Sequence, residues 1–410
     1  MPIFDQGYQH WEGTLSGHLW RWWTITRHGV RAQLRNRFVR LFLLVAYVPA
    51  IALIAVLAVW GLLEQQAESV LTLLRRVLPA EMIAQPQDFR LAVWTIAYSF
   101  FFKAELFISM LMLLLIGPNL ISRDLRFNAL PLYFSRSLRR FDYLVGKLGV
   151  IGWFVAAVVI MPAVLAYVLG VGFSFQLSII EQTYPLLGAS LLYGLIIAVS
   201  AGTFMLALSS LSRRSIYVGL TWMGFWIVTT TVAGLLTVIH RETIFSQYRN
   251  EAMAEWRKGN RPPEGNFQKN RAEWEKYHQA QFQVFSRAQA RGEAAWAEVA
   301  DRDWRPTISY TANLDRLADL LLGTDSAWVT IGREVDRPRR LAGPMMALGM
   351  NPRERAQMAA LLAQPTSERR LANQIVAQYP WYWSAGILAG LLVFSLCVLT
   401  FRIQSLDRLK

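Results

Sequence analysis

The chain has 410 residues, of which 54% are hydrophobic and 17% charged, and its formal net charge is +14. Soluble domains carry about 25% charged residues, and the mean hydropathy here is +0.28, so the composition excludes an ordinary soluble globular protein. The arginines lie beside long apolar runs, which indicates membrane-flanking segments rather than a nucleic-acid-binding surface.

The N-terminal segment 1–40 is polar, aromatic and basic, and it shows no cleavable signal peptide. Apolar residues recur at helical spacing across 19–41, and arginines occupy the other face. This pattern predicts an amphipathic helix lying in the cytoplasmic membrane surface. A soluble helix is the alternative, but the segment offers no domain for such a helix to pack on. The apolar positions are Leu19, Trp23, Val30, Leu34, Phe38 and Leu41.

Apolar runs long enough to cross a membrane, about 20 residues each, recur along the rest of the chain. They predict an all-α membrane protein with six transmembrane helices. The six runs are 41–63, 94–121, 148–170, 186–211, 216–239 and 382–401.

The flanks of these runs predict the orientation. Arginine and lysine cluster before the first run, between the second and third, between the fourth and fifth, and after the sixth. In the loop 171–185, by contrast, the only charged residue is Glu181. Both termini are therefore expected in the cytoplasm. Tryptophans at the opposite ends of the runs are expected to form an interfacial belt: Trp60, Trp94, Trp381 and Trp383.

The hydrophilic region 240–380 is expected outside the cell as a helical domain inserted between spans five and six. Pro262 and Pro263 divide two helical patterns, 243–258 and 266–300, which predicts a projecting helical hairpin. Shorter amphipathic pieces follow at 313–322, 352–363 and 367–378. The expected domains are 1–40, 41–239 with a loop at 118–147, 240–380, and 381–410 with span six and a cytoplasmic tail.

Lys103 and Glu105 lie within the second predicted span, where each charge costs on the order of 3 kcal/mol. One interpretation is that they line a translocation route at a dimer interface; the other is that Lys103 snorkels to the headgroups from an outer interfacial helix. Residues two positions apart do not face each other on a helix. Thr229 and Thr230 of span five are candidates for the same route, although such threonines commonly bond to their own helix carbonyls.

No catalytic or cofactor motif accompanies these spans. The sequence contains no GxxxxGK[ST], HExxH or GxSxG pattern. The five histidines are scattered, and the one cysteine, Cys397, lies in an apolar run. We therefore expect no enzymatic activity, no metal site and no bound cofactor in this chain.

The loop 117–147, GPNLISRDLRFNALPLYFSRSLRRFDYLVGK, is basic and too long for a turn. It resembles the loop between the second and third spans of ABC-2 type transporter permeases, which often carry Ile-Ser, Asp-Leu-Arg, Leu-Tyr-Phe-Ser-Arg, Asp-Tyr and Gly-Lys in this order. The matching elements here are Ile121-Ser122, Asp124-Leu125-Arg126, Leu132 to Arg136, Asp142-Tyr143 and Gly146-Lys147.

The chain's last 30 residues are also similar to that family's final span and basic tail. The chain departs from the pattern in two places. Ser137 stands where a proline is common, and 240–310 resembles an insertion in place of a short external loop. The likeness concerns the family and does not indicate the substrate.

The resemblance implies an exporter in the inner membrane of a bacterial cell, with this chain as the permease. Two copies, or one copy and a related second permease, would pair with two separate ATPase subunits that bind the ATP. The loop would be the element that couples the spans to the ATPase. Its candidate coupling residues are Arg123, Asp124, Arg126, Tyr133, Arg136, Arg139 and Arg140.

Two other functions stay open. A non-transporting membrane subunit could couple ATP hydrolysis to an extracytoplasmic partner of 240–380. An ATP-independent secondary transporter is disfavoured, because paired broken helices and internal repeats are not evident.

Overall fold

The computed structural model describes residues 20–75, 78–134, 138–174, 178–260, 271–332 and 378–407. All regular elements in these residues are helices, and six helical segments are long and apolar enough to cross a membrane. The chain is thus a multi-pass, all-helical membrane protein, and the prediction of six candidate spans is confirmed.

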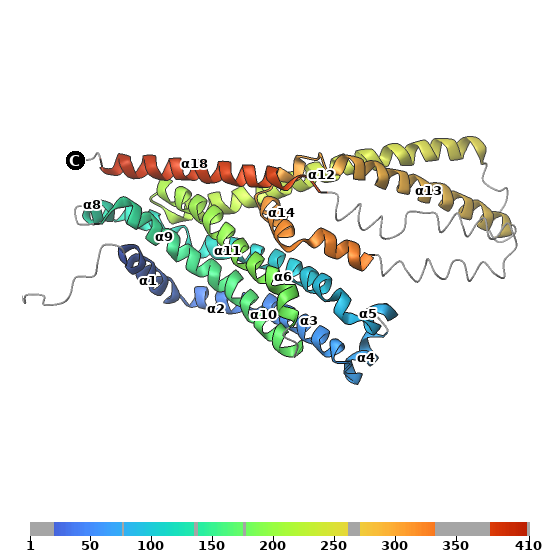
Figure 1. Ribbon diagram of the computed structural model, residues 1–410. Helices are drawn as coiled ribbons and strands as arrows, with labels where there is room; N and C mark the ends of the chain where they lie inside the picture. Colours follow the sequence, from blue (N-terminus) through green and yellow to red (C-terminus); the bar gives the residue numbers. More distant parts are fainter. Residues whose placement is uncertain are drawn as a thin grey trace, which may run out of the picture.

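The helices form an elongated bundle with two different ends (Figure 1). We call the end that holds α1, α8 and the C-terminus of α18 the platform end, and the opposite end, with α4, α5 and the α12–α13 hairpin, the far end. In chain order the elements are α1 Arg21–Leu34, α2 Arg37–Val45, α3 Val48–Glu64, α4 Glu68–Leu74, α5 Ala80–Ala84, α6 Pro86–Ile116, α7 Asn119–Arg126, α8 Ala129–Phe134, α9 Arg140–Val155, η2 Ala156–Ile160, α10 Met161–Ser174, α11 Ser178–Leu211, α12 Ser215–Gly259, α13 Arg271–Ala300, η3 Arg305–Ile308, α14 Tyr310–Leu322 and α18 Trp381–Asp407.

The predicted amphipathic helix 19–41 is two helices, α1 and α2. Asn36 adopts an extended conformation between them, and its side chain accepts a hydrogen bond from the backbone N–H of Phe38. Asparagine is a favoured N-cap because this bond satisfies a free donor of the new helix. The α2 helix then belongs to the first candidate span, which runs from Arg37 to Glu64.

The second and third candidate spans are continuous helical segments. For the second span this decides between a single helix and a separate outer interfacial helix. Helix α6 runs unbroken from Pro86 to Ile116, so residues 91–103 are not a separate interfacial helix. The third span contains a π-helical segment, η2, between α9 and α10. Such segments often occur where helices adjust to a functional contact, and η2 packs against α6 and α11.

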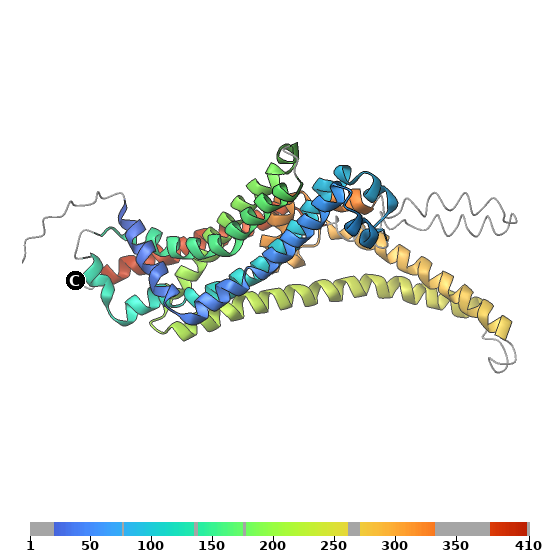
Figure 2. The same ribbon diagram turned by 90° about the horizontal axis from the view of Figure 1, so that it is seen from below.

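Helix α12 continues through the membrane into the hairpin without a break. The helix predicted at 243–258, the first of the hairpin, is therefore not separate but the outer part of α12, which has 45 residues. No glycine or proline occurs between 235 and 258, so nothing in the chain ends the helix at the membrane boundary. Helix α13 packs back along α12, and Figure 2 shows this hairpin diverging from α3 and α6 toward the far end.

The predicted surface piece 313–322 is α14, and it lies inside the bundle. It packs against α6, α11, α12 and α18. Ser309 caps its N-terminus, and Gly323 ends it at a φ of 67°, a left-handed conformation that glycine adopts without strain. The predicted piece at 352–363 lies outside the described residues, as does the piece at 367–378 except for its last residue.

The expected tryptophan belt is wrong for two of its members. The exposed fraction of Trp60 is 4% and that of Trp94 is 0%, so both rings fill the bundle interior instead of facing lipid. Trp94 packs edge-on against Tyr167. A large aromatic ring fills this space between the helices. Hydropathy does not distinguish a tryptophan buried in this way from one at the membrane surface. Trp381 is exposed, as expected of a belt residue.

Candidate functional site

Helix α7, at the platform end, is fixed to α11 by one hydroxyl. Ser209 Oγ accepts hydrogen bonds from the backbone N–H groups of Ile121, at 3.1 Å, and Ser122, at 3.0 Å. The same hydroxyl donates to the carbonyl of Pro118 at 3.0 Å. The first turn of α7 is thus capped by a side chain 88 residues away in the sequence, which ties the loop after span two to span four.

A second connection fixes the other end of α7 to α9. The carboxylate of Asp124 accepts a hydrogen bond from Tyr143 Oη at 2.7 Å and forms an ion pair with Lys147 Nζ at 2.7 Å. The carboxylate of Asp124, a predicted coupling residue, thus positions α7 within the chain. The element between spans two and three is therefore attached to both α9 and α11.

Helix α1 packs closely on α9 through small residues. Thr26 Oγ1 donates to the carbonyl of Gly146 at 3.0 Å. A Cβ added at Gly146 would lie 2.7 Å from Ile25, and one added at Gly149 would lie 2.4 Å from Thr26. Glycine at these two positions is what allows the close approach. Together α1, α7, α8 and α9 form a connected layer, which we call the platform.

The outer tip of the platform, residues 127–141, is apolar and basic. Its exposed apolar side chains are Phe127, Leu132, Tyr133 and Phe141. Arg139 and Arg140, both predicted coupling residues, are also exposed there. Burial against Tyr143 and the nearby Asp124 carboxylate raise the pKa of Tyr133 above its ordinary value. Arg136 lies outside the described residues.

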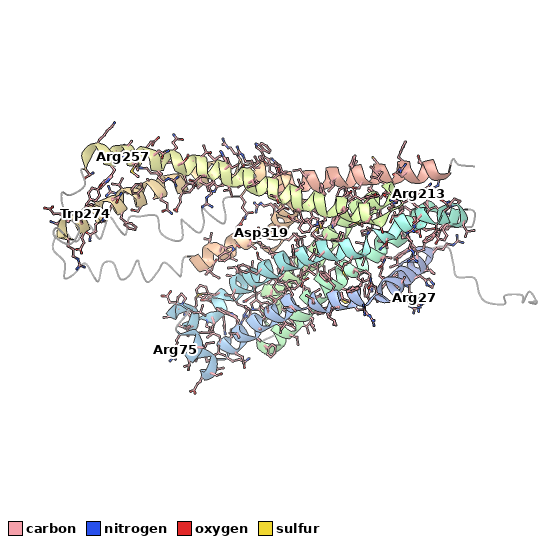
Figure 3. All side chains as sticks on the ribbon, turned by 180° about the vertical axis from the view of Figure 1, so that it is seen from behind. Arg27, Arg75, Arg213, Arg257, Trp274 and Asp319 are labelled. Atoms are coloured by element: carbon pink, nitrogen blue, oxygen red, sulfur yellow. The ribbon has the colours of Figure 1, made fainter. Side chains whose placement is uncertain are left out.

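The predicted residues Arg123 and Arg126 belong to a different surface. They line a cleft of about 450 Å³ between the α1–α2 junction, α7 and the 212–214 linker. Arg213 contributes a third guanidinium, and no aspartate or glutamate is among the described lining residues. We call this surface the arginine cleft; Figure 3 labels Arg213 at the platform end.

The two charges of the second span face different surroundings. Lys103 is exposed, whereas Glu105 has an exposed fraction of 0%. Neither carboxylate oxygen of Glu105 has a hydrogen-bond partner among the described residues. The expectation from spacing is confirmed: the two residues do not neutralise each other.

Helix α14 connects Lys103 with the predicted threonines. The Lys103 ammonium interacts electrostatically with Asp315. Thr230 Oγ1 shares hydrogen bonds with Ser309 Oγ at 3.1 Å and Thr311 Oγ1 at 3.0 Å, at the start of α14. Thr229, in contrast, donates to the carbonyl of Trp226 in its own helix. Of the predicted route residues, Lys103 and Thr230 therefore interact with α14 or the residue that caps it, a helix that was predicted to belong to the outer domain.

Asp315 is a buried carboxyl group of α14. Burial raises its pKa to about 7; the Lys103 ammonium opposes this rise and the Asp319 carboxylate adds to it. Asp315 Oδ1 is buried without a hydrogen-bond partner among the described residues. Asp319, labelled in Figure 3, lies in the middle of the molecule one turn further along α14.

The far end is held by a buried ion pair that sequence reasoning missed. Arg90 of α6 donates from Nε to Glu64 Oε1 at 2.6 Å and from a second nitrogen to Oε2 at 2.9 Å. It also donates to Gln182 of α11 at 3.3 Å. Both charges lie at predicted span ends, where arginine normally indicates topology only, so no sequence pattern predicts the pair.

The described residues contain no group of three or more histidine, cysteine, aspartate or glutamate side chains that could hold a metal ion. Comparison of the chain with protein-family models, with curated proteins and with solved structures finds no match in any of the three.

Proposed function

We propose that the chain is the membrane-spanning subunit of an ABC-2 type ATP-driven transporter in a bacterial inner membrane. Two copies pair with two separate ATPase subunits, and the platform end faces the cytoplasm. The arginine-rich flanks of the candidate spans support this orientation, and the loop 117–147 supports the family.

The observation that carries the proposal is the double attachment of α7. Ser209 ties it to span four, and Asp124 ties it to span three through Tyr143 and Lys147. A force applied to α7 reaches two spans through these hydrogen bonds and packed helices. ATP-driven motion of a partner at the tip requires such a connection.

The tip also has the chemistry of a protein interface. Aromatic and arginine side chains dominate binding energy at interfaces because they combine large apolar area with directional donors. The tip presents exposed Phe127, Tyr133 and Phe141 beside Arg139. Phe127, Leu132 and Tyr133 lie between the candidate span that ends at Arg126 and the one that begins at Arg140, so a protein partner covers them better than lipid does.

A non-transporting, force-transmitting subunit is the second candidate. Helix α12 runs without interruption from the platform end into the far-end hairpin, which favours transmission of movement to a partner of the hairpin. Helix α14 fills the space between four spans, which also suits a subunit without an open route. Both candidates require the ATPase.

Purification of the tagged chain from its native membrane tests the proposal. We expect a Walker-motif ATPase to co-purify in equal amount. Tyr133→Ala with Arg139→Ala should reduce the recovered ATPase at least about tenfold, because two interface anchors are lost, while the chain still inserts in the membrane.

The matched control removes an exposed arginine of the hairpin and an exposed tyrosine at the start of α18, both away from the tip of the platform; Arg257→Ala with Tyr382→Ala should retain the full amount of ATPase. Arg257 lies near the hairpin tip (Figure 3). Recovery of the wild-type chain with no ATPase would contradict both candidate functions. Equal recovery with the tip variant would contradict the assignment of the tip as the docking surface.

A further inference from the structure

The arginine cleft gathers positive charge that the described residues do not neutralise. Arg123, Arg126 and Arg213 line it together with polar side chains, and no ion pair among the described residues involves any of the three. Asp124, the nearest acidic residue in sequence, is already bonded to Tyr143 and Lys147. Arg123, Arg126 and Arg213 are exposed, and three like charges that line one cavity favour the binding of an anion there.

The donor set suits a phosphate group. Guanidinium groups bind phosphate oxygens in a bidentate manner, and Asn119, Ser122 and Ser215 add polar atoms to the lining. Ser215 is also the first residue of α12, whose N-terminus has no side-chain cap. The partial positive charge of that helix end favours an anion in the cleft.

The position of the cleft indicates where the phosphate comes from. Two candidate spans begin at its edges, one at Arg37 and the other at Ser215. The cleft therefore lies at the level where lipid phosphates lie. Its volume, about 450 Å³, is within the range of small-molecule pockets, about 300–1,000 Å³, and exceeds what a bare phosphate ion needs.

Apolar surfaces lead away from the cleft on its membrane side. Exposed side chains along α2 and on the first two turns of α12 offer contact to acyl chains. They are Phe38, Leu41, Leu44, Ile216, Tyr217 and Leu220. A soluble phosphate compound would gain nothing from these surfaces, whereas a phospholipid would contact both.

We propose that the arginine cleft binds the headgroup of an acidic phospholipid, with the acyl chains along α2 and α12. The bound lipid bridges the α1–α2 junction, α7 and the start of α12, three elements that otherwise meet around an uncompensated positive cavity. Occupancy therefore stabilises the platform at the point where α12 begins. This site does not depend on the proposed function, because the ATPase is assigned to the tip.

Native mass spectrometry of the full chain, without any ATPase, tests the proposal. The chain is released from nanodiscs of phosphatidylglycerol and phosphatidylcholine. We expect one phosphatidylglycerol to be retained per chain in preference to phosphatidylcholine. Arg123→Gln with Arg213→Gln should lower its occupancy about tenfold or more, because two charge-assisted contacts are removed.

The control variant, Arg27→Gln with Arg31→Gln, removes the same charge from exposed positions of α1 outside the cleft and should retain the lipid. Thermal unfolding gives the second readout: phosphatidylglycerol should raise the Tm of the wild type and the control but not of the cleft variant. Equal loss of lipid in the control would overturn the site and leave only general surface attraction.

Two further outcomes would overturn the lipid assignment. In the first, inorganic phosphate or glycerol phosphate raises the Tm in pure phosphatidylcholine nanodiscs, and the cleft variant abolishes that effect. In the second, the cleft variant keeps phosphatidylglycerol but loses the co-purifying ATPase, which would make the cleft a protein contact. Loss of lipid with full ATPase recovery would support the assignment and leave the docking tip intact.

Discussion

Glu105 and Glu64 are both buried within candidate spans, but only one of them has a partner. Glu64 forms a two-bond ion pair with Arg90, whereas both oxygens of Glu105 lack hydrogen-bond partners among the described residues. A buried charge without a partner is costly, and removal of one member of a buried pair leaves the other uncompensated. The same substitution should therefore have opposite effects at the two positions.

We expect Glu105→Gln to leave the free energy of unfolding unchanged or to raise it, within about 1 kcal/mol. Glu64→Gln, the control, should lower it by about 3–5 kcal/mol because Arg90 loses its charged partner. Thermal unfolding in detergent measures both. A stability loss in Glu105→Gln as large as that in Glu64→Gln would show that Glu105 has a partner. Reduced ATPase stimulation with intact stability would favour a role for Glu105 in transport.

Ser209 offers a second test, with a matched serine on the same helix. Ser209→Ala leaves the N–H groups of Ile121 and Ser122 without their acceptor, so the Tm should fall by the equivalent of about 1–2 kcal/mol. Ser190→Ala should be nearly silent, because Ser190 Oγ only donates to Leu186 of its own helix. Equal Tm values for the two variants would contradict the capping role.

Helix α14 is the element whose stability should respond to pH. Because burial raises the pKa of Asp315 to about 7, the folded chain binds this proton more tightly than the unfolded chain, in which the pKa is about 3.9. Stability from this group is therefore highest at low pH and falls as the pH rises from about 4 to about 7.

Asp315→Asn should remove that part of the pH dependence. Relative to the wild type, the variant should be stabilised by about 4 kcal/mol at pH 8 and by about 1.5 kcal/mol at pH 5. Asp301→Asn, at an exposed position, should show no such difference between the two pH values. The same stability difference at both pH values in Asp315→Asn would mean that this carboxyl does not titrate in this range.

The sequence predicted the elements better than their surroundings. Six long apolar runs predict six spans, since length and hydropathy are local properties. The burial of α14 was missed, because the spacing of apolar and charged residues in NLDRLADLLL is that of an ordinary surface helix. Its aspartates lie inside the bundle only because α14 packs against α6 and α11. Ser209 was missed for a related reason: a serine near a span end carries no signal of a partner 88 residues away.

At the scale of the whole molecule, the open question is which end faces the cytoplasm. In a Cys397→Ala background, we expect Gln247→Cys, on the outer part of α12, to react with a membrane-impermeant thiol reagent on intact cells. Phe141→Cys, at the platform tip, should react only after lysis, since arginine-rich flanks remain inside. The reverse pattern of labelling would invert the orientation.

The uninterrupted length of α12 has a geometric consequence. Its 45 residues extend about 68 Å at 1.5 Å per residue. A tilt of about 5° about Ser215 therefore displaces the Gly259 end by about 6 Å, slightly more than the 5.4 Å pitch of one helical turn. An angular change small enough to preserve most contacts in the 212–214 linker is thus large enough to shift a partner of the hairpin by a full turn of helix.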